Sequence, residues 1–221
     1  MRTLIHMWLS PSCRAVRIAL AEKDLDFDMK VENVWDRRPS FLALNPACEV
    51  PVLQDGDRVI AGGYAVYEYL DEVYPQPSLY GGDSIQRAEI RRLVDWFDGK
   101  FAREVTDNLV TEKIVKRFYG RGQPDSTAVR AGHANIHYHL DYIGYLTDRR
   151  KWLAGDELSM ADVVAAAQIS CIDYLGDVPW GEHDLTREWY ARVKSRPSFR
   201  PLLADHLPGA RPPQHYADLD F

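Results

Sequence analysis

The stretch Asn45-Pro46-Ala47-Cys48-Glu49-Val50-Pro51-Val52-Leu53 places a proline directly before a strand-like Val-Leu pair. Pro51 has no backbone N–H for a sheet ladder, so it fits the end of a loop that enters a strand through a fixed turn, one that can be cis. In a cis turn, the backbone N–H and C=O of Val50 would face outward and pair with an extended, peptide-like ligand. An ordinary loop leading into an edge strand is the alternative for this stretch taken alone.

Two further segments give this turn its setting. Ser10-Pro11-Ser12-Cys13 separates an apolar, strand-like run at 3–9 from a helix-like run at 13–22, and Ala61-Gly62-Gly63 opens another helix-like run at 64–73. Between them, Asp55-Gly56-Asp57 has the composition of a hairpin turn. This order of parts resembles the N-terminal thioredoxin-like domain of the glutathione S-transferase superfamily.

The remaining patterns extend the resemblance over the chain. Charged and apolar residues alternate over 26–31, which predicts a half-buried strand; a loop at 34–39 and a short helix at 40–44 should follow. Pro75 to Gly82 is the best linker candidate and ends the first domain near residue 80.

No strand pattern follows the linker. Long helices are predicted over 84–117 and 126–150, interrupted by 120–125, and the first has an apolar face made by Ile90, Leu93, Val94, Phe97 and Phe101. Ser159 and Asp162 form a capping box before an apolar helix, as in the core helix of glutathione transferase C-terminal domains, and Arg196-Pro197 resembles a helix start near their ends. The expected fold is therefore an α/β thioredoxin-like domain (1–80), an all-α domain (81–207) and a C-terminal tail (208–221).

Composition excludes several classes of function. The 221 residues include 27 Lys and Arg against 33 Asp and Glu, a net charge of −6, so bulk attraction to nucleic acid is not expected. Apolar runs are too short for membrane insertion, and the N-terminus has no signal-peptide pattern. Three cysteines, Cys13, Cys48 and Cys171, match no zinc spacing and indicate reduced thiols in the cytoplasm.

Ser10 and Cys13 are the candidate catalytic residues. Ser10 stands where many glutathione transferases keep the hydroxyl or thiol that acts on the glutathione sulfur, at a helix N-terminus that favours a thiolate. Capping of that helix is an equally weighted role for Ser10. Cys13 would be the second position of a Cys-x-x-Cys-like pair whose first cysteine is missing, and packing at the helix end is favoured over a redox role.

Three departures from the family pattern disfavour glutathione chemistry. The acidic residue and the serine that receive the γ-glutamyl group correspond to Gly62 and Gly63, which offer no side-chain ligand. Glu49 stands where a Lys or Gln would meet the glycyl carboxylate, and Cys48 replaces the turn glycine. Lost charge-assisted hydrogen bonds are each worth about 1.5–3 kcal/mol, so binding should weaken by orders of magnitude. The alternative is an atypical glutathione-dependent transferase or reductase using Ser10 or Cys13 and the Val50-Pro51 backbone.

Two segments are candidate protein-binding sites. Trp35, Arg37 and Arg38 lie in the loop beside the cleft and combine the side chains that interfaces use as anchors, although a Trp tucked into the core carries equal weight. The tail ends in Asp218-Leu219-Asp220-Phe221, an acidic and apolar terminus that can dock as a short linear motif or fray.

These segments, the glycine pair and Leu175-Gly176-Asp177-Val178-Pro179-Trp180 together resemble the FtsZ-localized protein A subfamily of alphaproteobacteria, a glutathione-transferase-like group of cell-division proteins. The resemblance implies a homodimeric, non-enzymatic adaptor that binds FtsZ polymers at the division site and contacts another division protein through its tail, without a cofactor.

Two weaker ideas complete the candidates. A scaffold with an unrelated small-molecule pocket would place that pocket between the domains, near Trp96 and Phe97. His133, His137 and His139 suggest a metal site, but no nearby Cys or Glu completes a ligand set, so a solvated or packed helix face is favoured.

Overall fold

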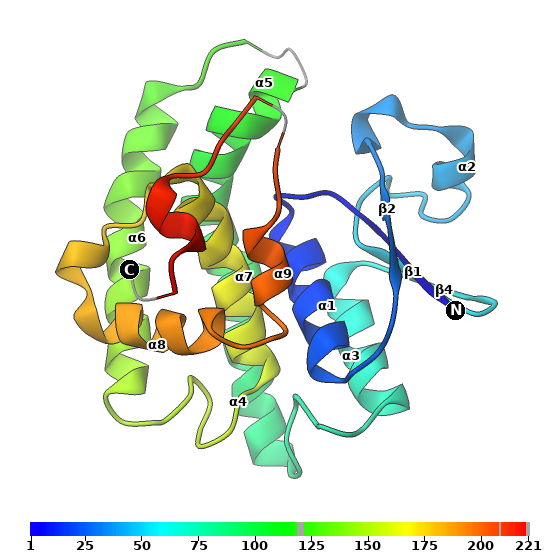
Figure 1. Ribbon diagram of the computed structural model, residues 1–221, viewed down its shortest axis with the longest axis horizontal. Coiled ribbons are helices and arrows are strands. Elements are labelled where there is room, and N and C mark those ends of the chain that lie inside the picture. The colour runs from blue at the N-terminus through cyan, green and yellow to red at the C-terminus, as the bar shows by residue number, and fades with distance from the viewer. Residues whose placement is uncertain (119–121, 208, 220–221) are drawn as a thin grey trace.

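A computed structural model describes residues 1–118, 122–207 and 209–219, and shows a sheet with its helices beside a larger helical part (Figure 1). The four strands are β1 (Arg2–His6), β2 (Asp28–Val31), β3 (Val52–Asp55) and β4 (Arg58–Ala61), in the order β2-β1-β3-β4. β1 runs parallel to β2 and antiparallel to β3, and β3 and β4 form the hairpin predicted at Asp55-Gly56-Asp57.

Helices cover both faces of this sheet. They are α1 (Pro11–Glu22), the 3₁₀ turn η1 (Val34–Asp36), α2 (Pro39–Leu42) and α3 (Gly63–Val73). Leu4 and Leu53 point into the main core with residues of α1 and α3, whereas Ile5 and Val52 pack with Phe41 of α2 on the opposite face. This alternation along β1 and β3 is the period of two that a strand imposes.

The prediction of a half-buried second strand is wrong. All four residues of β2 are exposed, including Met29 and Val31 at 44% and 47%. The reason is the position of β2 at the edge of the sheet, where helices do not cover it as they cover β1 and β3. The first strand is also shorter than the predicted 3–9, since it ends at His6 and the chain turns before Ser10.

The second part is helical, and the described residues after the linker form no strand beyond two isolated bridges. Its elements are α4 (Ser84–Asp95), the π-helical segment η2 (Trp96–Val115), α5 (Lys116–Phe118), α6 (Ser126–Thr147), α7 (Met160–Leu175), η3 (Trp180–Glu182), α8 (Asp184–Lys194), α9 (Arg200–Leu203) and η4 (Gln214–Ala217). The predicted helix over 84–117 corresponds to α4, η2 and α5, and its five predicted apolar residues are all buried. Of the predicted break at 120–125, residues 120 and 121 lie outside the described chain.

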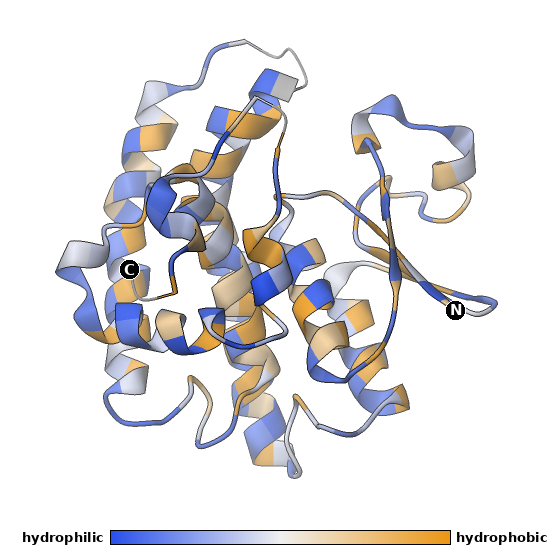
Figure 2. Ribbon diagram, viewed as in Figure 1, coloured by the Kyte–Doolittle hydropathy of each residue, from blue (hydrophilic) through white to orange (hydrophobic). Residues whose placement is uncertain are grey.

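Helix α7 is the centre of the molecule. Residues 160–174 are all buried, and apolar residues dominate the helix, whereas α6 alternates apolar and polar ones (Figure 2). The predicted capping box is present: Asp162 accepts from the Ser159 backbone N–H at 3.1 Å, and also from the Leu153 N–H and the Trp189 indole N–H, each at 2.9 Å. One buried carboxylate thus joins the start of α7 to its neighbours.

A polar network joins the two parts where α1 packs against α7. We call Arg14, Arg17, Asp205, Ser170 and Tyr216 the interdomain network. Arg17 donates two hydrogen bonds to the Asp205 carboxylate, at 2.7 and 2.9 Å, and Arg14 adds a third at 3.2 Å. Arg14 also donates to the hydroxyls of Ser170 and Tyr216, and its side chain and that of Asp205 are no more than 3% exposed.

In the part of the chain that the structure describes, no helix combines the length and apolar composition needed to cross a membrane.

Candidate functional site

The candidate site is a cavity of about 330 Å³ between the sheet and the helical part. It lies after the carboxyl end of β1, beside the loop that carries Trp35. Its lining is largely apolar: Met7, Trp8, Leu9, Val31, Asn33, Trp35, Val110, Ile114, Val115 and Leu207. Since the lining comes from the segment after β1, from β2, η1 and η2, and from the segment after α9, the cavity depends on how the two parts pack together.

Ser10 is the N-cap of α1. Its hydroxyl accepts a hydrogen bond from the Cys13 backbone N–H at 3.4 Å, and Pro11 occupies the first helical position, where its missing N–H costs nothing. The capping role weighed from sequence is therefore the one that the geometry supports.

Cys13 is poorly suited to chemistry. Its side chain is fully buried, and burial raises the pKa of the thiol to about 11, against the opposing effect of the Ser10 hydroxyl. A thiol with that pKa is almost entirely protonated at neutral pH, so it is a weak nucleophile. Cys13 packs in the core, as favoured from sequence.

The Val50-Pro51 turn retains the backbone arrangement expected of a thioredoxin-like domain. The bond is cis, and the Asn45 side chain holds the preceding loop by donating to the Glu49 carbonyl at 2.8 Å and accepting from the Ala47 N–H at 3.2 Å. Cys48 has a φ of 58°, the left-handed conformation that a glycine adopts without strain. Its buried thiol donates to the Val34 carbonyl at 3.2 Å, which ties this turn to the loop of Trp35.

Gly62 and Gly63 leave the start of α3 without side-chain ligands, and the structure shows why larger residues do not fit. Gly62 has a φ of 94°, which strains any L side chain. A Cβ on Gly63 would lie 2.9 Å from the Tyr67 hydroxyl and 3.0 Å from the Ser12 Cβ. Because Tyr67 is 1% exposed, it has little room to retreat. A serine at position 63 therefore requires the core beneath α3 to rearrange.

Glu49 is exposed beside the same turn, so its charge faces any anion that approaches. The site thus combines a capped helix, a protonated thiol, two glycines and a negatively charged carboxylate where the family pattern has a Lys or Gln. The two glycines therefore offer no side-chain ligand at the start of α3, and the Cys13 thiol is a weak nucleophile.

Trp35 lies at the rim of the cavity rather than in the core. It is half-buried on η1, and its ring contributes to the cavity lining. Arg37 is exposed, with a left-handed φ of 44°. Arg38 is paired with Glu32 through two hydrogen bonds, one at 3.0 Å, and that carboxylate is 2% exposed. Of the predicted interaction residues in this loop, Trp35 is half-buried and Arg37 exposed, while Arg38 is held by Glu32.

The tail packs on the helical part as far as it is described. Tyr216 is fully buried in η4, and its hydroxyl accepts from Arg14 at 3.0 Å and donates to the Leu202 carbonyl at 3.1 Å. Asp218 is exposed and Leu219 half-buried, while Asp220 and Phe221 lie outside the described residues. Fraying therefore does not describe the segment up to Ala217.

Sequence reasoning missed Asp98. This half-buried carboxyl lies next to Tyr67 and accepts from the Gln168 amide at 3.0 Å, and burial raises its pKa to about 6. A signal was present, because Asp98 falls between Phe97 and Phe101 on the apolar face of its helix. A carboxylate in that position has to be desolvated, which is what raises its pKa.

The other two ideas find little support in the geometry. Phe97 is fully buried, and the Trp96 indole donates to His139 at 3.1 Å. His137 contacts His183 at 2.9 Å, so these two histidines of α6 have separate partners. Across the described residues, no three metal-binding side chains of the His, Cys, Asp and Glu types converge.

Comparisons with known proteins agree with this architecture. The family model of the glutathione S-transferase N-terminal domain matches residues 4–78. FtsZ-localized protein A of Caulobacter vibrioides is 46% identical to this chain over 224 aligned residues, which cover 100% of this chain and 98% of that protein. Glutathione S-transferase 3 of Zea mays is 29% identical, over 97% and 98% of the two chains.

Solved structures give the same result. A crystal structure of a glutathione S-transferase from Rhodospirillum rubrum F11 superposes with a TM-score of 0.98 at 59% identity, covering all of both chains. The structure of FzlA from C. crescentus superposes with a TM-score of 0.96 at 46% identity, covering 100% of this chain and 99% of that one. The chain therefore belongs to the glutathione S-transferase family, in the group that contains FtsZ-localized protein A.

Proposed function

We propose that this protein is a non-enzymatic adaptor with a glutathione transferase fold that binds FtsZ filaments in the cytoplasm, at the division site, and helps to regulate cell division and wall constriction. The observation that carries the proposal is the pair Gly62 and Gly63, which offer no side-chain ligand at the start of α3. The Tyr67 hydroxyl occupies the space that a side chain at position 63 would need. The full-length similarity to FtsZ-localized protein A supports FtsZ as the partner.

The filament-binding surface is the rim of the apolar cavity. Trp35 lines that cavity, and the exposed Arg37 stands beside it on the same loop. An aromatic anchor next to an arginine is the pairing that dominates the binding energy of many interfaces. The exposed Asp218 on the tail offers a separate contact for another division protein, and a homodimer would carry two copies of each surface.

Co-sedimentation of the purified protein with GTP-assembled FtsZ, with and without excess glutathione, tests the proposal. We expect the protein to pellet with the polymer, and glutathione to leave the pelleted fraction unchanged. Trp35→Ala should reduce pelleting, whereas Tyr138→Ala, which truncates a 58% exposed aromatic residue on α6, should not. A clean supernatant for the wild-type protein would contradict the assignment of this partner.

An atypical glutathione-dependent transferase or reductase is the second candidate, favoured by the apolar cavity beside the Ser10 end of α1. Isothermal titration with glutathione distinguishes the two functions. Saturable binding at about millimolar affinity or tighter, lost in Ser10→Ala, would favour the enzyme; the adaptor predicts no saturable heat in either protein.

A further inference from the structure

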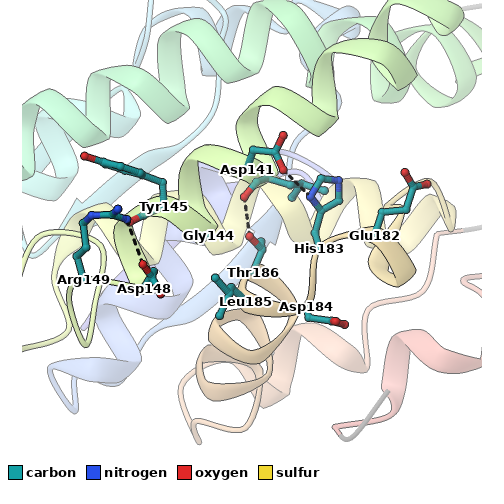
Figure 3. Close-up of a pocket in the computed structure, with 11 residues that line it drawn as sticks. Asp141, Gly144, Tyr145, Asp148, Arg149, Glu182, His183, Asp184, Leu185 and Thr186 are labelled. Carbon is teal, nitrogen blue, oxygen red and sulfur yellow. Dashed lines mark hydrogen bonds and ion pairs between the residues drawn. The ribbon is translucent and has the colours of Figure 1, made fainter.

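A second hollow, remote in sequence from the cavity at Trp35, lies between the end of α6 and the segment η3–α8 (Figure 3). We call it the α6–α8 groove; its volume is about 470 Å³. It is lined by Leu140, Asp141, Gly144, Tyr145, Asp148, Arg149, Glu182, His183, Asp184, Leu185 and Thr186. None of these residues lines the cavity at Trp35, so the two surfaces are distinct.

The walls of this groove are held together from below. Thr186 of α8 donates to the Leu140 carbonyl of α6 at 2.6 Å. The His183 side chain is 5% exposed and lies between Asp141, at 3.1 Å, and His137, at 2.9 Å. Because contacts tie α8 and η3 to α6, the groove is formed before any partner arrives, which lowers the entropic cost of binding.

Carboxylates dominate the charge of the groove. Asp141, Asp148, Glu182 and Asp184 line it, and their side chains are 74%, 57%, 70% and 74% exposed. The one lysine or arginine among the lining residues is Arg149. It is already occupied, since it donates to the Asp148 carboxylate at 3.2 Å and to the Tyr145 carbonyl at 2.9 Å. Asp184 is likewise paired with Arg187 of α8, at 3.1 Å. The negative excess of the groove therefore comes from Asp141 and Glu182, whose ion-pair partners are His183 and His137.

Two apolar side chains are exposed among these charges. Tyr145 is 56% exposed and Leu185 46% exposed, and the Arg149 guanidinium lies 4.0 Å from the centre of the Tyr145 ring. In Figure 3, Leu185 lies beside Thr186, with Asp148 on one side and Asp184 on the other. An apolar contact flanked by carboxylates suits a ligand that has an apolar side chain between cations.

A divalent cation does not suit this arrangement. Within residues 1–118, 122–207 and 209–219, no group of three carboxylate, imidazole or thiol side chains is close enough to hold a metal ion. The carboxylates are instead distributed along the groove from Asp148 to Asp184, as an extended ligand with several separated positive charges would require (Figure 3).

We propose that the α6–α8 groove binds a short basic segment of a partner protein. An apolar side chain of that segment packs on Leu185 and Tyr145, and flanking lysine or arginine side chains pair with Asp141 and Glu182. Charge complementarity between a basic segment and this preformed acidic groove supports the proposal. It goes beyond filament binding because the groove is a different surface from the cavity at Trp35.

The test uses the full-length protein and a short fluorescein-labelled peptide of alternating lysine and leucine, with a glutamate–leucine peptide of equal length as the charge control. Fluorescence anisotropy should detect binding of the lysine peptide only. Glu182→Lys should weaken it by about tenfold or more at low ionic strength, with the difference shrinking as salt is added. Glu188→Lys makes the same charge change on an exposed residue of α8 outside the groove, and should have little effect.

Leu185→Ser, with the 82% exposed Ile85→Ser as its control, tests the apolar contact separately and should weaken the lysine peptide by several-fold. Circular dichroism melting should show that every variant folds. Equal affinity in wild type and Glu182→Lys, equal losses in Glu182→Lys and Glu188→Lys, or equal binding of the glutamate peptide would each overturn the proposal. So would Mn²⁺ binding that Glu182→Lys abolishes, which would make the groove a cation site.

Discussion

The start of α3 and the interdomain network differ in how they use polar side chains. At the start of α3, the positions expected to hold a ligand are Gly62 and Gly63, and Glu49 of the nearby turn is exposed. In the network, two guanidinium groups share one buried carboxylate and two hydroxyls. The polar groups that join the two parts are therefore buried and paired within the protein, whereas the start of α3 offers no side-chain ligand.

The largest effect is expected in the network. Asp205→Ala leaves Arg14 and Arg17 buried without their shared carboxylate, so the free energy of unfolding should fall by about 3–5 kcal/mol. Urea unfolding measures it. Glu188→Ala, on the surface of α8, should change stability by less than about 0.5 kcal/mol. A comparable loss of stability in both variants would contradict a specific stabilising role for the interdomain network.

Asp98, which lies next to Tyr67, should make the free energy of unfolding depend on pH. Burial raises its pKa from 3.8 to about 6, so between these values the folded protein binds more protons than the unfolded chain at this carboxyl. The free energy of unfolding therefore falls as the pH rises through this window, by at most about 3 kcal/mol. Asp98→Asn should remove that fall, so its stability relative to wild type should increase from pH 4 to pH 7. A constant difference over this range would contradict the assignment.

Tyr216→Phe tests how firmly the tail is joined to the network. The substitution removes the hydroxyl that accepts from Arg14 and donates to the Leu202 carbonyl, while keeping the buried ring. A hydrogen bond to a charged group contributes about 2 kcal/mol, so a loss of that size is expected in thermal or urea unfolding. Tyr145→Phe, which alters a 56% exposed tyrosine on α6, is the matched control and should be close to neutral. Equal effects of the two variants would mean that the tail hydroxyl contributes nothing specific.

The smallest effect on stability is expected at Ser10, the N-cap of α1. Ser10→Ala removes the cap of α1 and should lower the free energy of unfolding by about 1 kcal/mol, while co-sedimentation with FtsZ stays as in wild type. A loss of filament binding with little loss of stability would instead give Ser10 a direct functional role.

Local signals predicted the fold well because each acts over a few residues. The Asp-Gly hairpin, the capping box at Ser159 and Asp162, and the apolar face of the helix after Ser84 are all present. The alternation at 26–31 predicted a half-buried strand, which is wrong, because alternation does not determine whether a helix covers the strand. Sequence alone also does not reveal that Tyr67 fills the space in front of Gly63.

The interdomain network was not predictable in the same way. Arg14 and Tyr216 are 202 positions apart in the chain, and neither stands out in its own segment. From sequence, Arg14 would be expected to be solvated, because only the packing of α1 against α7 removes it from water. The composition of the tail likewise does not show that one of its tyrosines is buried.

The buried Tyr216 also determines where mechanical load would enter the molecule. A partner that gripped the chain beyond Ala217 would not draw out a slack tether, because η4 is anchored one residue earlier. Tension would pass from Tyr216 to Arg14, and so directly into α1 of the sheet-containing part. η4 would therefore act as a rigid coupling between the tail and the fold.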